Sequence, residues 1–189
     1  MAGERLFESG PSPGEGLTKD FEKRQNKKGE TFIDTPGFSD RNLKPTAAKA
    51  ILKALRQSGD LKVIFVVCLE EEIVDEEDIL TMKFALAAAP DIGMNYGIIV
   101  NMVSEDSLEE LKAKPQFFLD KALKEIPERN RCLDNRVLFL GEMTELENLF
   151  NIVLSSDDPN SLKLNSFFKN EVPIVNIKPE NVKDVNLEN

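Results

Sequence analysis

The chain has 189 residues, a formal net charge of -10 at pH 7 and no histidine. The missing histidine excludes Ser-His-Asp and Cys-His catalysis and His-ligated zinc, and the acidic charge disfavours nucleic acids and anionic membranes as ligands. Two cysteines, and no apolar stretch long enough to span a bilayer, predict a cytoplasmic protein with reduced thiols.

The N-terminal part predicts little regular structure. Residues 1–20 include a stretch rich in Gly, Pro and Ser, which predicts a loop, and the charged residues 21–28 predict either an exposed edge strand or a loop. A short strand is expected over residues 30–33.

That strand runs into an Asp-Thr-Pro-Gly segment at residues 34–37. At a strand end, the carboxylate of Asp34 can hold a magnesium ion, usually through water, and the N–H of Gly37 can approach a phosphate oxygen closely. The alternative is a plain type II turn, in which Gly37 takes a positive φ after Pro36. The complete string from Phe32 to Asp40 favours the phosphate-sensing interpretation.

Strand and helix patterns alternate through the rest of the chain. The apolar runs predict buried parallel strands, a capping-box pattern at Ser107 and Glu110 opens a helix, and Pro115 is expected to kink or split it. In order, the expected elements are helix 43–57, strand 61–69, acidic loop 70–78, helix 75–89, strand 96–103, helix 107–126, strand 137–140, helix 142–154, a short helix within 155–170, and an extended tail from Val172.

This alternation predicts an α/β fold with a mostly parallel sheet, in which ligands lie at the carboxyl ends of the strands. Besides residues 34–37, polar side chains follow two further strands, at Glu70 and from Asn101 to Asp106. The Asn101 segment is placed to contact a nucleobase, although a polar turn at a strand end would have the same pattern.

Three segments carry a resemblance to a known family: Phe7-Glu8-Ser9, Gly16-Leu17-Thr18-Lys19 and Phe32 to Asp40. With them, the chain resembles the AIG1-type GTPases, immune-associated G domains of plants and animals. The resemblance covers about residues 5–155. It implies an incomplete P-loop GTPase-like, three-layer α/β domain over residues 1–155, with a switch-like loop region over 1–30, followed by a short helix and extended tail over 156–189.

The resemblance also implies ligands, namely GTP or GDP with Mg²⁺. Thr18 and Asp34 would hold the magnesium ion, Gly37 would contact the phosphate, and Asn101 would be a remnant of the base-reading Asn-Lys-x-Asp motif. Met102 stands at the Lys position of that motif and Ser104 at the Asp position. A surface loop threonine is the alternative interpretation of Thr18.

The chain departs from the family at its start. Nothing in the 189 residues matches Gly-x-x-x-x-Gly-Lys-Ser/Thr, and Met1 falls where the first helix of the family ends, so the first strand and the P-loop are expected to be missing. Nucleotide binding should then be weak or lost. The strands at 30–33 and 61–69 would either pair directly or leave open edges.

Two hypotheses follow. The chain is a GTP-binding switch and a GTPase in its complete form, or it is a nucleotide-free pseudo-GTPase that acts as a protein-interaction module. The acidic run from Glu70 to Asp78 could bind a basic partner, and the alternative interpretation is a solvated loop without such a role. Whether the chain binds a protein partner or forms a homo-oligomer is left undecided. No catalytic residue is assigned, because Gln25 and Arg41 are interpreted as solvated side chains.

Overall fold

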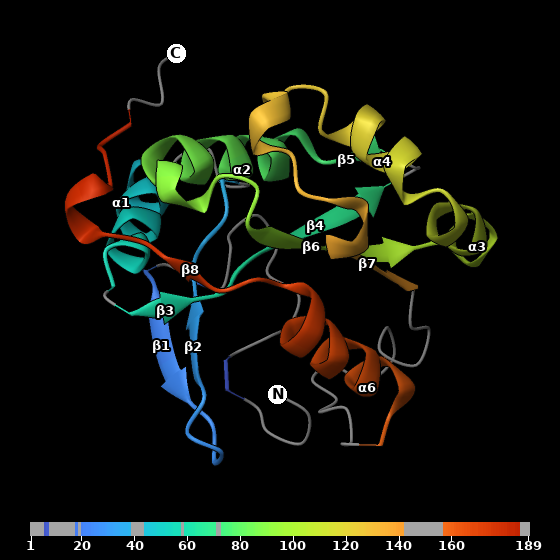
Figure 1. Ribbon diagram of the computed structural model, residues 1–189, viewed down its shortest axis with the longest axis horizontal. Helices are drawn as coiled ribbons and strands as arrows, with labels where there is room; N and C mark the ends of the chain where they lie inside the picture. Colours follow the sequence, from blue (N-terminus) through green and yellow to red (C-terminus); the bar gives the residue numbers. More distant parts are fainter. Residues whose placement is uncertain are drawn as a thin grey trace.

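The computed structural model describes residues 6–7, 18, 20–38, 44–57, 59–70, 73–141 and 157–185, which form an α/β fold with mixed sheets (Figure 1). The α/β class predicted from the sequence is therefore confirmed. The expected helix over 142–154 lies outside the described residues, as do Ser9, Gly16 and Arg41.

A four-stranded sheet in the order β5-β4-β6-β7 forms the centre. Strands β4, β6 and β7 are parallel, whereas β5 pairs antiparallel with the end of β4. Two antiparallel pairs, β1-β2 and β3-β8, lie outside this sheet. The strands are β1 (Glu22–Gln25), β2 (Thr31–Asp34), β3 (Asp60–Leu61), β4 (Val63–Glu70), β5 (Ile73–Val74), β6 (Tyr96–Val103), β7 (Val137–Gly141) and β8 (Val175–Asn176).

Helices cover both faces of the central sheet, so the described residues form three layers (Figure 1). Helix α2 packs against β4 and α1 packs against α2, while α6 and the turn after it lie on the opposite face. The helices are α1 (Lys44–Leu55), α2 (Glu76–Ala88), α3 (Glu105–Ala113), α4 (Pro115–Ala122), α6 (Pro159–Ser166) and a π-helical turn η4 (Phe167–Glu171), with 3-10 turns at Pro90–Ile92, Glu128–Asn130, Asp134–Arg136 and Pro179–Asn181.

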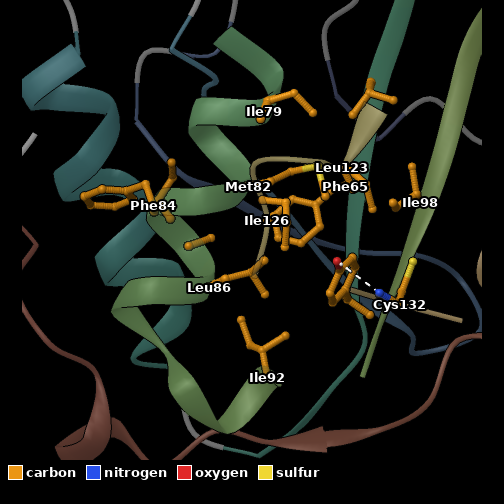
Figure 2. Close-up of a cluster of buried hydrophobic side chains, with 14 of the residues drawn as sticks. Phe65, Ile79, Met82, Phe84, Leu86, Ile92, Ile98, Leu123, Ile126 and Cys132 are labelled. Carbon is orange, nitrogen blue, oxygen red and sulfur yellow. Dashed lines mark hydrogen bonds between the residues drawn. The ribbon is translucent and has the colours of Figure 1, made fainter. Parts of the chain in front are cut away.

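The larger core lies between the sheet and helices α1, α2 and α4 (Figure 2). Alternate residues of β4 and β6, such as Phe65 and Ile98, point into it, as the period of two in a strand requires. Inside it the phenol oxygen of Tyr96 accepts a hydrogen bond from the backbone N–H of Cys132 at 3.3 Å. Burial raises the pKa of the Cys132 thiol to about 12, so this cysteine is a packed, protonated side chain.

The second face of the sheet is covered less completely. Ile99 packs against Phe167 and Val172, which belong to η4 and the residue after it. Val66 of β4 lies on the same face and is 58% exposed. The expected burial of β4 on both faces is therefore wrong at the middle of the strand.

The C-terminal segment after η4 packs into the larger core instead of extending away from it. Val175, Ile177 and Val182 are buried, and β8 pairs with β3. Asp91 accepts hydrogen bonds from the backbone N–H of Lys178 and the side chain of Asn181, and these bonds lower the pKa of its carboxyl group. This segment crosses the molecule beside β3 (Figure 1).

The β1-β2 hairpin is separate from the central sheet. Its register places Glu22 opposite Asp34 and Gln25 opposite Thr31, and β2 pairs with β1 alone. Of the two outcomes expected for the strands at 30–33 and 61–69, direct pairing is therefore not observed in the described residues.

One helix starts at a different residue from the one expected, and another expected helix is divided in two. Helix α3 begins at Glu105, because Ser104 caps it by accepting the N–H of Ser107; the expected start at Ser107 is wrong. Pro115 splits the helix as predicted and becomes the first residue of α4.

No helix among the described residues is both long enough and apolar enough to cross a membrane.

Candidate functional site

The candidate site lies where β2 ends. Asp34 is the last residue of that strand and is half-buried, and the hydroxyl of Thr18 donates a hydrogen bond to its Oδ2 atom at 2.7 Å. Sixteen residues separate the two in the chain, so the contact is tertiary. The structure thus brings together the two side chains that the sequence analysis assigned to magnesium.

The donor set suits a hard cation. Adjacent ligands of an octahedral Mg²⁺ ion, each about 2.1 Å from the metal, lie about 3 Å apart. The Thr18 hydroxyl can be such a ligand directly, whereas Asp34 would act through a water ligand of the ion. In the structure the oxygens of the two side chains are joined by a hydrogen bond of 2.7 Å. No group of three His, Cys, Asp or Glu side chains gathers in the described residues, and Mg²⁺ at a phosphate site typically takes only one or two protein ligands.

Gly37 lies in the segment that follows. Its φ is not in the left-handed region, so the type II turn with a positive φ at Gly37 is not what the structure adopts. It is exposed, and an added Cβ would meet no atom within 4 Å. Neither its backbone conformation nor the packing of the described residues requires a glycine here.

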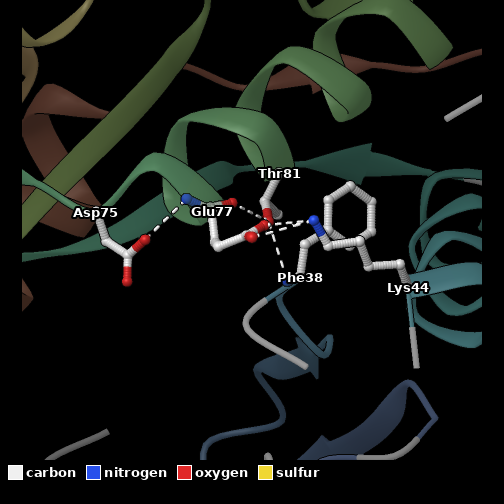
Figure 3. A network of polar contacts seen from close by, with 5 residues as sticks. All are labelled: Phe38, Lys44, Asp75, Glu77 and Thr81. Carbon is white, nitrogen blue, oxygen red and sulfur yellow. Dashed lines mark hydrogen bonds and ion pairs between the residues drawn. The ribbon is translucent and has the colours of Figure 1, made fainter. Parts of the chain in front are cut away.

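Phe38 anchors the end of this segment to α2. Its ring is 1% exposed and meets Phe84 edge-on, with centroids 5.3 Å apart. Its N–H donates to the hydroxyl of Thr81 at 3.2 Å, and that hydroxyl donates to the carbonyl of Glu77 at 2.8 Å (Figure 3). The segment from Asp34 to Phe38 is therefore held at both ends, with Gly37 exposed between them.

A half-buried ion pair lies beside this anchor. The ammonium of Lys44, the first residue of α1, lies 2.8 Å from Oε2 of Glu77 and donates a hydrogen bond to Oε1 at 3.1 Å (Figure 3). Asp75 caps α2 by accepting the N–H of Glu77 at 2.8 Å. These contacts connect α1, α2 and the segment after β2.

The sequence analysis missed this anchor. The signal available was the spacing of Thr81 and Phe84, which lie three residues apart and so share one helix face. Nothing in the sequence indicated that Phe38 would be the residue to meet that face.

Asn101 lies apart from this cluster. It belongs to β6 of the central sheet, opposite Cys68, whereas Asp34 belongs to the β1-β2 pair. Within the described residues, no recorded hydrogen bond joins Asn101 to Thr18, Asp34 or Gly37. The structure does not bring the fourth predicted residue into contact with the other three.

The residues after Asn101 have an unusual conformation. Met102 has a φ of 59°, its side chain is 47% exposed, and β6 bulges between Val100 and Val103. The hydroxyl of Ser104 is engaged with Ser107 in the helix cap. The Ser104 hydroxyl is neutral and already bonded in this cap, so it does not replace the carboxylate that would accept both donors of a guanine base.

Asp78 is a further carboxyl group at the carboxyl end of β4. Its Oδ2 accepts the backbone N–H of Cys68 at 2.9 Å, and burial raises the pKa of the carboxyl group. It lies in the run that the sequence analysis interpreted as an acidic loop, where seven of nine residues are acidic, and nothing in that run distinguishes the buried carboxylate from the solvated ones.

Comparison with known proteins adds no assignment. No protein-family model matches the chain, and no curated protein matches it at a significant level of sequence similarity.

Proposed function

We propose that the chain is a GTPase-like domain of the AIG1 type, a guanine-nucleotide switch in which Thr18 and Asp34 form the magnesium-facing half of the site. GTP or GDP with Mg²⁺ is the proposed ligand. Binding by this chain alone is weak, since its 189 residues include no phosphate-binding loop of the Gly-x-x-x-x-Gly-Lys-Ser/Thr type.

The observation that carries this proposal is the 2.7 Å contact between Thr18 and Asp34. The family resemblance assigns the metal to these two residues, and in the structure their side chains are joined by a hydrogen bond.

The roles in this proposal are those that the family resemblance implies. Thr18 and Asp34 hold the ion, the exposed Gly37 offers its N–H to the terminal phosphate, and Phe38 ties the segment to α2. Bound Mg²⁺ would neutralise charge on the phosphates. In the proposed GTPase reaction, the terminal phosphoryl group would pass to water.

A second candidate is a nucleotide-free pseudo-GTPase that acts through protein contacts. One observation favours it: the segment after Asp34 is fixed to α2 through the buried Phe38. The engaged Ser104 hydroxyl agrees with a site that does not select guanine.

The metal half of the site can be tested with Mn²⁺ as a spectroscopic substitute for Mg²⁺. We expect electron paramagnetic resonance titrations with GTP present to detect bound Mn²⁺, and Thr18→Val and Asp34→Asn to weaken its binding at least tenfold. The control is Thr31→Val, which makes the same Thr-to-Val change on an exposed residue of β2, the strand that ends at Asp34. Equal Mn²⁺ binding by all variants would contradict the assigned site, and no binding by any folded variant would favour the pseudo-GTPase.

A further inference from the structure

A strongly basic segment lies on the β1-β2 hairpin of this acidic protein. Four of the six residues from Lys23 to Lys28 are cationic, in a chain whose formal net charge is -10. The side chains of Lys23, Arg24, Lys27 and Lys28 are all exposed. The hairpin projects from the body, with its turn at the lower margin of Figure 1.

The outer edge of this hairpin is available for strand pairing. Strand β1 pairs with β2 on one side, and in the described residues no strand pairs with its other side. The side chains of Lys23, Arg24 and Gln25 are exposed, so the edge lies at the surface. Figure 1 places β1 on the outer side of β2.

The pairing pattern identifies which backbone groups face outward. The N–H of Asn26 donates to the carbonyl of Glu30 at 3.0 Å, which continues the hairpin ladder. Because antiparallel ladders alternate, Arg24 and Glu22 pair inward with β2 while Lys23 and Gln25 direct their N–H and C=O groups outward. Among the described residues, the contact made to the carbonyl of Lys23 is a long one, 3.4 Å, from the guanidinium of Arg24.

The cations lie on both faces of this edge. Successive side chains of a strand alternate, so Lys23 lies on one face and Arg24 on the other. Their present partners are exchangeable, because Lys23 contacts Gln57 at 3.5 Å and the ion pair of Arg24 with Glu22 is exposed.

The same charges discriminate between strands that could pair here. A second copy of β1 would bring Lys and Arg against Lys and Arg, and like charges directly opposite each other destabilise a strand pair. A long polyanion or an anionic membrane would extend past the hairpin and meet the acidic body. A short acidic strand gains the charge complementarity without that repulsion.

We propose that the outer edge of β1 is a docking site for an extended acidic peptide segment of a partner protein. The segment adds a strand to the hairpin, bonds the outward backbone groups of Lys23 and Gln25, and places acidic side chains on both faces of the sheet against Lys23 and Arg24. Adjacent acidic residues are therefore the signature of the partner. This site is independent of the nucleotide proposal.

The test uses a fluorescent nine-residue peptide, Thr-Val-Glu-Glu-Val-Glu-Glu-Val-Thr, with blocked ends. Two control peptides replace either all glutamates by glutamine or the three valines by proline, which keeps the charge but prevents strand pairing. We expect anisotropy titrations of the unaltered protein to give affinities for both controls at least tenfold weaker than for the parent peptide.

The protein variants test the same edge. The double variant Lys23→Glu with Arg24→Glu should bind the parent peptide about tenfold more weakly, since two attractive cross-strand pairs become repulsive. The matched control, Lys121→Glu with Lys124→Glu, reverses two exposed charges on and just after α4 and should change the affinity less than twofold. Thermal unfolding of each variant verifies that it is folded.

Hydrogen exchange provides the backbone measurement. The amides of Lys23 and Gln25 should gain protection when the peptide is bound. The proposal is overturned if the proline peptide binds as well as the parent, if the charge reversal has no effect, or if phosphatidylserine vesicles or single-stranded DNA bind this edge more tightly than the peptide. Because the control peptides are titrated against the unaltered protein, the proposal can still be tested if a protein variant fails to fold.

Discussion

The hydroxyl of Thr18 and the carboxylate of Asp34 form a contact that contributes to the fold as well as to the proposed site. We expect Thr18→Val to lower the free energy of unfolding by about 1 kcal/mol, because it removes a hydrogen bond to a half-buried carboxylate. Urea denaturation measures this change. The control is Thr31→Val, the same substitution on an exposed residue of β2. A loss of stability as large as that of Thr18→Val would contradict the account.

The carboxyl group of Asp78 makes stability depend on pH. Its pKa is raised above the ordinary 3.8 by burial, so between 3.8 and the folded-state value the native chain binds more protons than the unfolded chain. This contribution to stability therefore falls as the pH rises through that window. Asp78→Asn carries no charge to bury and keeps an acceptor for the N–H of Cys68.

We expect Asp78→Asn to be more stable than the unaltered chain at neutral pH, with the difference shrinking toward pH 4. Urea denaturation across this range, with Asp106→Asn as an exposed control, measures the effect. If the advantage of Asp78→Asn instead grew as the pH fell, the ionised carboxylate of Asp78 would be stabilising, which would contradict this prediction.

At the residue level, the sequence pointed to some residues that meet in the structure and gave no indication of others. The family pattern pointed to Thr18 and Asp34, and the structure places them in contact, although their metal role stays a prediction. The anchoring of Phe38 by Thr81 joins residues 43 positions apart. A pattern of neighbouring residues contains no information on such a pair, because it is decided by how β2 and α2 pack.

At the scale of single elements, local signals were reliable where the chain itself supplies the cause. Pro115 lacks a backbone donor and splits the helix as expected. Helix α3 starts earlier than predicted because Ser104 is an equally good cap that lies before Ser107. The strand expected over 61–69 is divided at Lys62, because Leu61 pairs with the distant strand β8 whereas β4 pairs with β6, and no local pattern contains that difference.

The packing of β6 against η4 gives an element-level prediction. A Cβ on Gly97 would lie 2.6 Å from Cγ2 of Val172 and 2.9 Å from the ring of Phe167. We expect Gly97→Ala to lower the free energy of unfolding by about 1–3 kcal/mol, since the close contact forces the neighbours apart. Thermal or urea unfolding measures the loss.

The matched control for Gly97→Ala is a double-mutant cycle with Val172→Ala. Shortening Val172 makes room for the new methyl group, so the loss in the double variant should be smaller than the sum of the two single losses. Additive losses would show that Gly97 is required for some reason other than the approach of Val172.

For the whole molecule, the alternation of strands and helices was enough to predict the α/β class. It did not predict the mixed sheet, the separate β1-β2 hairpin or the packed C-terminal segment. These depend on contacts between distant residues, such as Arg56 with Asp184 at 2.8 Å and the pairing of β3 with β8. Long-range pairings of this kind are settled by competition among packings and not by local propensity.

The central claim is that this chain has a magnesium-facing half of a nucleotide site without the loop that supplies most of the phosphate-binding energy. The measurement that tests it most directly is calorimetric titration of the folded chain with Mg-GTP, using Mg-ATP and the Asp34→Asn variant for comparison. We expect magnesium-dependent binding weaker than about 100 μM that Asp34→Asn abolishes. Micromolar binding, or binding that Asp34→Asn leaves unchanged, would contradict this account.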